Sequence, residues 1–238
     1  MKKYLFLLLI PCTFFSGCDT ALQILNSVET AGGLTNADIV SGLREALTIG
    51  TSNSANKLSS VDGFFKNAAI KILIPEDAKK VESTLRSVGM GSVVDKAILS
   101  MNRAAEDASK GAGTIFINAV KQMTIQDAVG ILKGGDFAAT TYFKSKTTIA
   151  LTEAFRPVIE TSLKNVNATK YWSDVTKVYN QFSSTKVNTD LAGYVTERAM
   201  EGIFYQVGLE EQKIRKDPVA RTTDILKKVF GSQAAKGK

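Results

Sequence analysis

Hydrophobic residues recur at helical spacing along most of this chain, and residues 93–108 show the pattern most clearly. One face of this stretch is apolar, at Val94, Ala97, Ile98, Met101, Ala105 and Ala108. The other side is polar, at Asp95, Asn102, Arg103, Glu106 and Asp107. Because the small alanines let neighbouring helices approach closely, the pattern predicts a central helix here.

Sequence signals for helix ends divide the rest of the chain. Thr35 and Asp38 fit a capping box that opens a helix reaching about Leu58. Thr124 and Asp127 fit a second capping box, which opens a shorter helix. Each signal marks the position at which a helix is expected to begin.

A long helix is expected to begin at Asp136, because aspartate is a good N-cap residue. Pro157 should kink or split this helix, since proline lacks an N–H and pushes Arg156 away from helical angles. Other helices are expected over residues 75–89, 114–123 and 168–182, from Asn188 or Thr189 onward, and from Asp217-Pro218 to Gly231. In the first of these, the side chains expected to face inward are Val81, Leu85 and Val88.

One short stretch alternates as a strand does, at Ile70, Ile72 and Ile74. The chain offers it no obvious pairing partner, so an extended segment lying on the helices is favoured. The predicted fold is therefore all-α, a single multi-helix domain of about 8–9 helices over residues 34–231, with at most one very short strand element. Residues 232–238 are expected to form a flexible basic tail.

The N-terminus predicts export and lipid attachment. Residues 1–17 combine a basic start, a short apolar run and small residues, as a secretory signal peptide does. The stretch Phe15-Ser16-Gly17-Cys18 resembles a bacterial lipobox, although Phe15 stands where leucine is usual. We expect Cys18 to carry a lipid and residues 18–33 to tether the domain to a membrane on the periplasmic side of the cell envelope. Ordinary signal cleavage that leaves Cys18 as a free thiol is the alternative, and the choice between inner and outer membrane stays open.

Composition narrows the chemistry. The chain has no histidine, and its cysteines are Cys12 and Cys18, which excludes a Ser-His-Asp triad, a Cys-His pair and a histidine zinc site. No metal and no cofactor are expected. The net charge of +7 is concentrated in residues 213–238, which carry +6. This segment either contacts an anionic lipid surface or is a solvated helix end whose lysines complement the helix dipole, and no nucleic-acid binding is expected.

Three motifs carry a family resemblance: residues 101–106, residues 134–143, and Ile214-Arg215-Lys216-Asp217-Pro218 continuing to Gly231. With these motifs in this order, the chain resembles the bacterial family known as domain of unknown function 4197. The resemblance covers nearly all of residues 34–231. It implies a lipoprotein-type signal and one helical domain, and it brings no activity or catalytic residue.

Two polar clusters are candidate sites. Asn102, Arg103 and Glu106 form either a buried polar network or a solvated salt-bridge face, since Arg103 and Glu106 are neighbours on a helix. The second cluster flanks the Asp217-Pro218 turn and consists of Arg215, Lys216 and Arg221. Its side chains either contact a phosphate or carboxylate or lock the turn, with Arg221 four residues beyond Asp217.

The favoured function is a membrane-tethered, non-catalytic helical envelope lipoprotein that binds a partner protein or an apolar ligand. The missing catalytic residue types and the apolar helix faces favour it. Aromatic residues available to line a cavity are Phe137, Tyr142, Phe143, Phe155, Tyr171, Trp172, Phe204 and Tyr205, although core packing is their commoner use. The alternatives are a carboxylate-dependent hydrolase acting on an envelope glycan, with Glu106 as general acid, and a structural protein that binds itself.

Overall fold

The two capping boxes form as the sequence predicts. The computed structural model describes residues 33–235, so the predicted signal peptide, Cys18 and most of the tether lie outside the described residues. Helix α2 (Asn36–Ser59) begins at Thr35, whose hydroxyl accepts the N–H of Asp38 while the Asp38 carboxylate accepts the N–H of Thr35. Thr124 and Asp127 repeat this exchange at the start of α6 (Ile125–Lys133).

The other helices account for nearly all of the remaining chain, and no β-strand occurs within residues 33–235. They are α3 (Lys79–Ser87), α4 (Gly91–Ser109), α5 (Ala112–Lys121), α7 (Ala138–Asn165), α8 (Ala168–Phe182), α9 (Leu191–Lys216) and α10 (Asp224–Phe230). Short 3₁₀ turns lie at η1 (Glu76–Ala78), η2 (Pro218–Ala220) and η3 (Gln233–Ala235). The all-α prediction is confirmed, and none of the described helices combines the length and apolar character needed to cross a bilayer.

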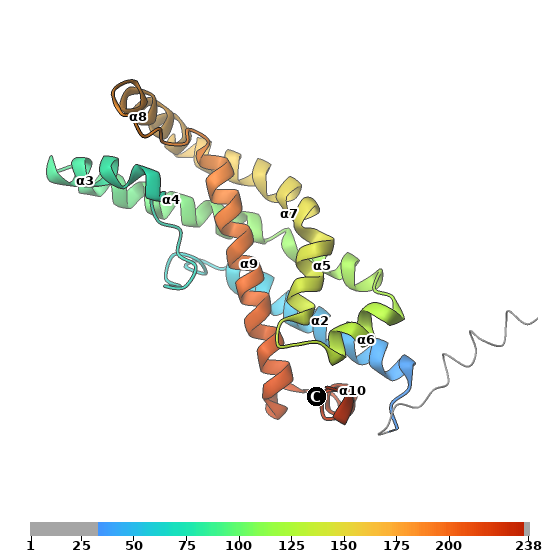
Figure 1. The fold of residues 1–238 in the computed structure, drawn as a ribbon. Helices are drawn as coiled ribbons and strands as arrows, with labels where there is room; N and C mark the ends of the chain where they lie inside the picture. Colours follow the sequence, from blue (N-terminus) through green and yellow to red (C-terminus); the bar gives the residue numbers. More distant parts are fainter. Residues whose placement is uncertain (1–32, 236–238) are drawn as a thin grey trace, which may run out of the picture.

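The long helices form the body of the molecule (Figure 1). Helix α4 packs against α2, α7 and α9, so the stretch predicted to be central does lie between the long helices. Its alanines Ala104, Ala105 and Ala108 are buried there and permit the close approach. Residue Asn102 and residue Glu106, on the side predicted to be polar, are buried as well.

The predicted cap of α7 is wrong, and of the kink or split expected at Pro157 the split does not occur. Asp136 does not cap this helix; its carboxylate pairs with Lys216 at 2.6 Å, and the cap position falls on Phe137. Pro157 does not split α7, which continues to Asn165. The proline lies on the exposed face, where water can satisfy the carbonyl it leaves free, while buried side chains before and after it hold the helix in register.

The segment 60–75 forms no strand, and residues 71–75 have no regular secondary structure. Ile72 and Ile74 are buried against the helices, as the favoured interpretation of the sequence expects. Phe64 is also fully buried, and its ring contacts the place where Gly202 of α9 lacks a Cβ. The absence of a side chain at Gly202 thus lets the loop approach α9 closely.

The C-terminal boundary differs from the prediction. Asp217 does accept the N–H of Val219, but it opens only the turn η2. The closing helix α10 begins later, with Thr223 as its N-cap. Turn η3 falls within the expected flexible tail, and Ala234 and Ala235 in it pack against the core.

Helices α3 and α8 project from one end of the body as two separate arms (Figure 1). No side chain of α3 is buried, and Val88 is 66% exposed, so the expectation that it faces inward is wrong. The N-cap of helix α9 is Asp190, whose carboxylate accepts the N–H of Gly193, so the helix does not start at Asn188 or Thr189. The start of α2 and helix α10 lie at the opposite end of the molecule (Figure 1).

Candidate functional site

An apolar groove of about 480 Å³ lies between the two arms. Val81 and Leu85 of α3 and Val93 of α4 line one side, and Tyr171 and Val175 of α8 line the other. The start of α9 also lines the groove. A concave, mostly apolar cavity of this size is typical of a small-molecule binding site.

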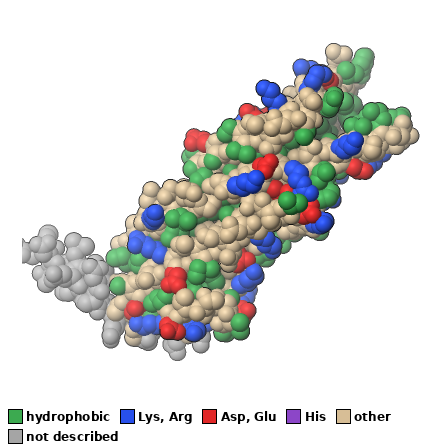
Figure 2. All heavy atoms as spheres, turned by 180° about the vertical axis from the view of Figure 1, so that it is seen from behind, with side chains coloured by type: hydrophobic (Ala, Val, Ile, Leu, Met, Phe, Trp, Pro, Cys, Tyr) green, Lys and Arg blue, Asp and Glu red, His purple; other side chains and the backbone are tan. Residues whose placement is uncertain are grey.

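The groove is continuous with exposed apolar side chains at the ends of the arms. On α8 they follow one helical stripe, at Tyr171, Val175, Val178 and Phe182, and Phe182 is 85% exposed. The facing arm adds Val88, Met90 and Val93. Figure 2 shows hydrophobic side chains gathered at the ends of both projections. An apolar patch of this kind marks a binding surface more often than a solvated one.

The base of the groove is fixed by Asn188. Its N–H donates to Asp77 at the root of the α3 arm at 2.9 Å, and its carbonyl accepts the indole N–H of Trp172 on α8 at 3.0 Å. One residue therefore ties the two arms together. Because the indole N–H is satisfied in this way, the ring of Trp172 can present its apolar surface to the groove.

Two charged residues line the groove, and they differ in their partners. Glu82 pairs with Arg86 at 3.0 Å, and Arg86 also reaches Asp95 at 2.9 Å. Hydrogen bonds to Asp95 and then to Glu82 raise the pKa of Arg86 above its ordinary value. Lys96 makes no ion pair with any residue that the structure describes. Of the two charged residues on the lining, Lys96 is therefore the one without a carboxylate partner.

The polar residues predicted on α4 are brought together as a buried network that holds the segment 60–75. The amide of Asn102 accepts the N–H of Ile72 at 2.9 Å and donates to the Ile72 carbonyl at 2.8 Å, as a neighbouring strand would. Glu106 accepts the N–H groups of Phe64 and Phe65 at 3.1 and 3.2 Å. Arg103 then pairs with Glu106 at 2.6 Å.

Asp62 completes this network on its exposed side. Arg103 reaches Asp62 at 2.7 Å, and Lys66 pairs with Asp62 at 2.8 Å. The hydrogen bond from Lys66, and then that from Arg103, holds the pKa of Asp62 below its usual range. Glu106, followed by Asp62, raises the pKa of Arg103. The buried members Asn102 and Glu106 bond the backbone of the segment 60–75, and Arg103 pairs with Glu106 and Asp62, so the cluster serves the fold.

The cluster around the Asp217 turn is also committed to the fold. Arg215 is buried against Glu211 at 2.8 Å, and its guanidinium donates to the carbonyl of Ile131 at 2.7 Å. Lys216 pairs with Asp136. Arg221 donates to the last carbonyls of α9, at Ile214 and Arg215, and so caps that helix instead of bonding Asp217.

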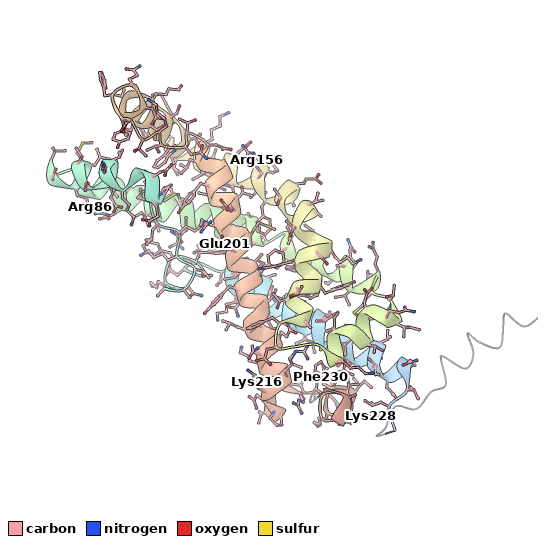
Figure 3. All side chains as sticks on the ribbon, in the orientation of Figure 1. Arg86, Arg156, Glu201, Lys216, Lys228 and Phe230 are labelled. Atoms are coloured by element: carbon pink, nitrogen blue, oxygen red, sulfur yellow. The ribbon has the colours of Figure 1, made fainter. Side chains whose placement is uncertain are left out.

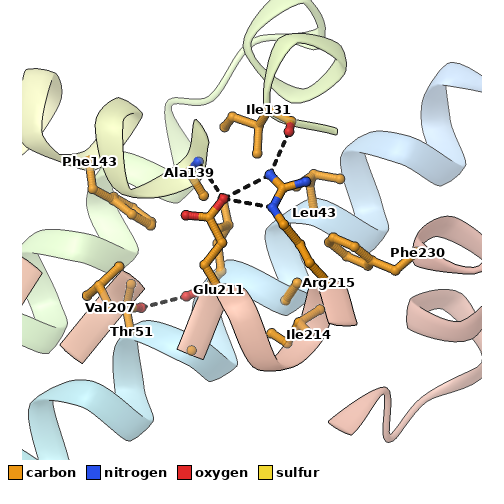
Figure 4. A pocket seen from close by; sticks show the side chains of 13 residues that line it. Leu43, Thr51, Ile131, Ala139, Phe143, Val207, Glu211, Ile214, Arg215 and Phe230 are labelled. Carbon is orange, nitrogen blue, oxygen red and sulfur yellow. Dashed lines mark hydrogen bonds and ion pairs between the residues drawn. The ribbon is translucent and has the colours of Figure 1, made fainter. Parts of the chain in front are cut away.

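Sequence reasoning missed Glu211, which replaces Asp136 as the cap of α7. Its carboxylate accepts the N–H groups of Ala139 and Thr140, both at 2.9 Å, and the Thr140 hydroxyl at 2.8 Å. Figure 4 shows Glu211 and Arg215 beside a cavity of only about 20 Å³. The sole signal in the sequence was the Glu211–Arg215 spacing of four residues on α9, which reads as an ordinary surface pair.

Of the aromatic residues considered for a cavity, Tyr171 and Trp172 line the groove. Phe143, Phe155 and Phe204 are buried in the core instead, and Phe116 packs edge-on against Phe143 and Phe204. Within residues 33–235, no three acidic, cysteine or histidine side chains gather where they could hold a metal ion.

The geometry defines a helical protein with a groove-shaped candidate binding site between its two arms. Residues 33–231 match the family described as Protein of unknown function (DUF4197), and the chain belongs to that family. No curated protein and no solved structure matches the chain.

Proposed function

We propose that this protein is a non-catalytic binding module of the bacterial cell envelope, tethered to a membrane and holding an apolar ligand between its two arms. The apolar groove of about 480 Å³ carries the proposal. Burying its lining against a ligand removes exposed apolar surface from water, at about 25 cal/mol per Å².

The tether is the part of this proposal that rests on the sequence. The lipobox-like stretch ending at Cys18 supports attachment, and the described fold begins at the end of the molecule that is remote from the groove. Helix α9 has 26 residues, and so spans about 39 Å between those ends. A lipid-anchored protein would therefore hold its groove away from the bilayer.

The position of Glu106 argues against the hydrolase alternative, in which it was the candidate general acid. Glu106 is buried, does not line the groove, and accepts two backbone N–H groups and the Arg103 guanidinium. A general acid must instead face a substrate and give up a proton to it. The structural arrangement thus favours binding over catalysis.

Binding of an uncharged apolar dye, Nile red, tests the ligand site. Emission should rise when the dye enters the groove, and Ala97→Phe, which fills the groove from its α4 wall, should weaken the dye's affinity by about tenfold. The matched control is Ala150→Phe on the exposed face of α7, which should bind as the parent does. Equal binding by both variants would contradict the proposal.

Fractionation of cells tests the tether separately. Cys18→Ala should move the protein from the membrane to the soluble fraction. Without the lipid, the short N-terminal apolar run is too short to span the bilayer and hold the protein there. A variant that stays as firmly membrane-bound as the parent would show that the anchor lies elsewhere.

A further inference from the structure

We infer that the ligand is a single acyl chain carrying an anionic headgroup, such as a fatty acid or a lysophospholipid, with the head held at Lys96. This inference rests on the proposed function, because it names the chemistry of the ligand in the same groove. Three observations carry it: the size of the groove, the charge on its lining, and the way its walls are built.

The size of the groove favours an acyl chain over a peptide helix as the ligand. Two turns of an inserted α-helix about 10 Å across would need roughly 800 Å³. The groove offers about 480 Å³, within the usual range of about 300–1,000 Å³ for small-molecule sites. A slender acyl chain fits between the α3 and α8 arms without forcing them apart.

The charge at the groove favours an acidic head. Glu82 pairs with Arg86, which it shares with Asp95, whereas Lys96 has no carboxylate partner among the described residues. Lys96 lies on α4 between Val93 and Ala97, which themselves line the groove. A carboxylate or phosphate placed there would pair with the ammonium while the chain attached to it lies against apolar walls.

The walls themselves suit a flexible apolar chain. Met90 and Met101 line the groove with adaptable thioether side chains, and Val93 and Val175 add branched apolar surface from opposite arms. The other polar side chain among the lining residues of α4, Ser100, bonds the Lys96 carbonyl. The interior therefore offers little that would select a polar ligand.

Trp172 provides a readout at the site, because it is the only tryptophan of the chain and lines the groove. Acyl chains labelled with bromine quench tryptophan only at short range, so quenching places the chain in the groove. The probes are a dibrominated 18-carbon fatty acid, its uncharged methyl ester, and a lysophosphatidylglycerol with the same brominated chain. All are used on the folded protein below the concentrations at which they form micelles.

Both anionic probes should bind about three- to fivefold more tightly than the ester, the contribution of one partly exposed ion pair. Lys96→Gln should remove that difference, Lys96→Arg should retain it, and the matched control Lys133→Gln on α6 should leave it unchanged. The tighter of the two anionic probes identifies whether a carboxylate or a phosphate head is preferred.

The outcomes separate this inference from the proposed function. Equal quenching by acid and ester, unaffected by Lys96→Gln, would overturn the anionic head while leaving apolar-ligand binding in place. Absence of quenching by every probe would overturn both. A stable dimer in light scattering that dissociates in Phe182→Ser would show that a second copy covers the arms, and would also overturn the inference.

Discussion

At the scale of single residues, Asn102 shows how a helix can replace a strand as a hydrogen-bonding partner. Its amide satisfies both the N–H and the carbonyl of Ile72, and also donates to the Ile98 carbonyl at 2.7 Å. The backbone around the buried Ile72 has no strand beside it in the described structure, so these bonds take the place of strand pairing.

Asn102→Ala should therefore destabilise the fold by about 2–4 kcal/mol, because it leaves two buried backbone groups without partners. The measurement is urea unfolding followed by circular dichroism. Asn56→Ala, on the exposed face of α2, is the matched control and should change stability by less than about 0.5 kcal/mol. A similar midpoint for the two variants would contradict this account of Asn102.

The sequence predicted the members of this cluster but not what they bind. A helical wheel places Asn102 at the apolar border, and Arg103 next to Glu106, from spacing alone. Their partners Ile72 and Phe64 come from a loop that lies 30 and 42 residues away along the chain. No local pattern encodes that contact, so burial of Glu106 could not be deduced from its position on the polar side.

At the scale of elements, α7 shows where local rules give way to packing. Asp136 and Pro157 both carry strong local signals, yet Asp136 does not cap α7 and Pro157 does not split it. Glu211 supplies the cap from another helix, and packing against α4 and α9 holds α7 continuous through its proline. By contrast, Thr35–Asp38 and Thr124–Asp127 are satisfied within their own first turn, and these were predicted correctly.

Pro157→Ala should raise the free energy of unfolding by about 1–3 kcal/mol, because alanine restores the missing backbone donor in a helix that packing already imposes. Urea unfolding measures the change. Lys164→Ala, also exposed on α7, is the control and should leave stability nearly unchanged. A loss of stability in Pro157→Ala would mean that the proline contributes to the native shape of α7.

Helix α10 is joined to the start of α2 by an ion pair that should respond to acid. Lys228 reaches Asp38 at 2.8 Å, and this bond, with those from Thr35, lowers the pKa of Asp38 from 3.8 to about 2. Because the folded value is the lower one, the pair contributes stability above about pH 4 and loses it as the pH falls towards 2. Figure 3 places Lys228 beside Phe230 at this end of the molecule.

Carbon NMR of the Asp38 carboxyl group should thus give a midpoint near pH 2 in the parent. Lys228→Gln should raise that midpoint towards the ordinary value, because the hydrogen bond from Lys228 is the largest cause of the lowered pKa of Asp38. Lys227→Gln, whose partner is the fully exposed Asp224, is the control and should not move it. An unchanged midpoint in Lys228→Gln would show that the two helices are not coupled through this pair.

At the scale of the whole molecule, the two ends have different characters. The sequence predicted the domain and its helices, but the groove arises because α3 and α8, distant along the chain, project side by side. In the folded protein, most of the described basic residues of the C-terminal segment form ion pairs with carboxylates. Its ion pairs are Lys213–Glu210, Arg215–Glu211, Lys216–Asp136, Lys227–Asp224 and Lys228–Asp38. This pairing reduces the charge available for the proposed contact with an anionic lipid surface.

The tethered protein should stand with its two arms directed away from the membrane. The chain enters the described fold beside α10, and α9 places the arms about 39 Å away from that end. Trp172, at the base of the groove, should therefore remain unquenched when the lipid-anchored protein is reconstituted in vesicles whose acyl chains carry bromine. Adding the soluble brominated fatty acid to the same vesicles should then quench it. Quenching by the vesicles alone would mean that the apolar ends of α3 and α8 insert into the bilayer, and that their exposed side chains serve as a membrane contact instead of the mouth of a ligand site.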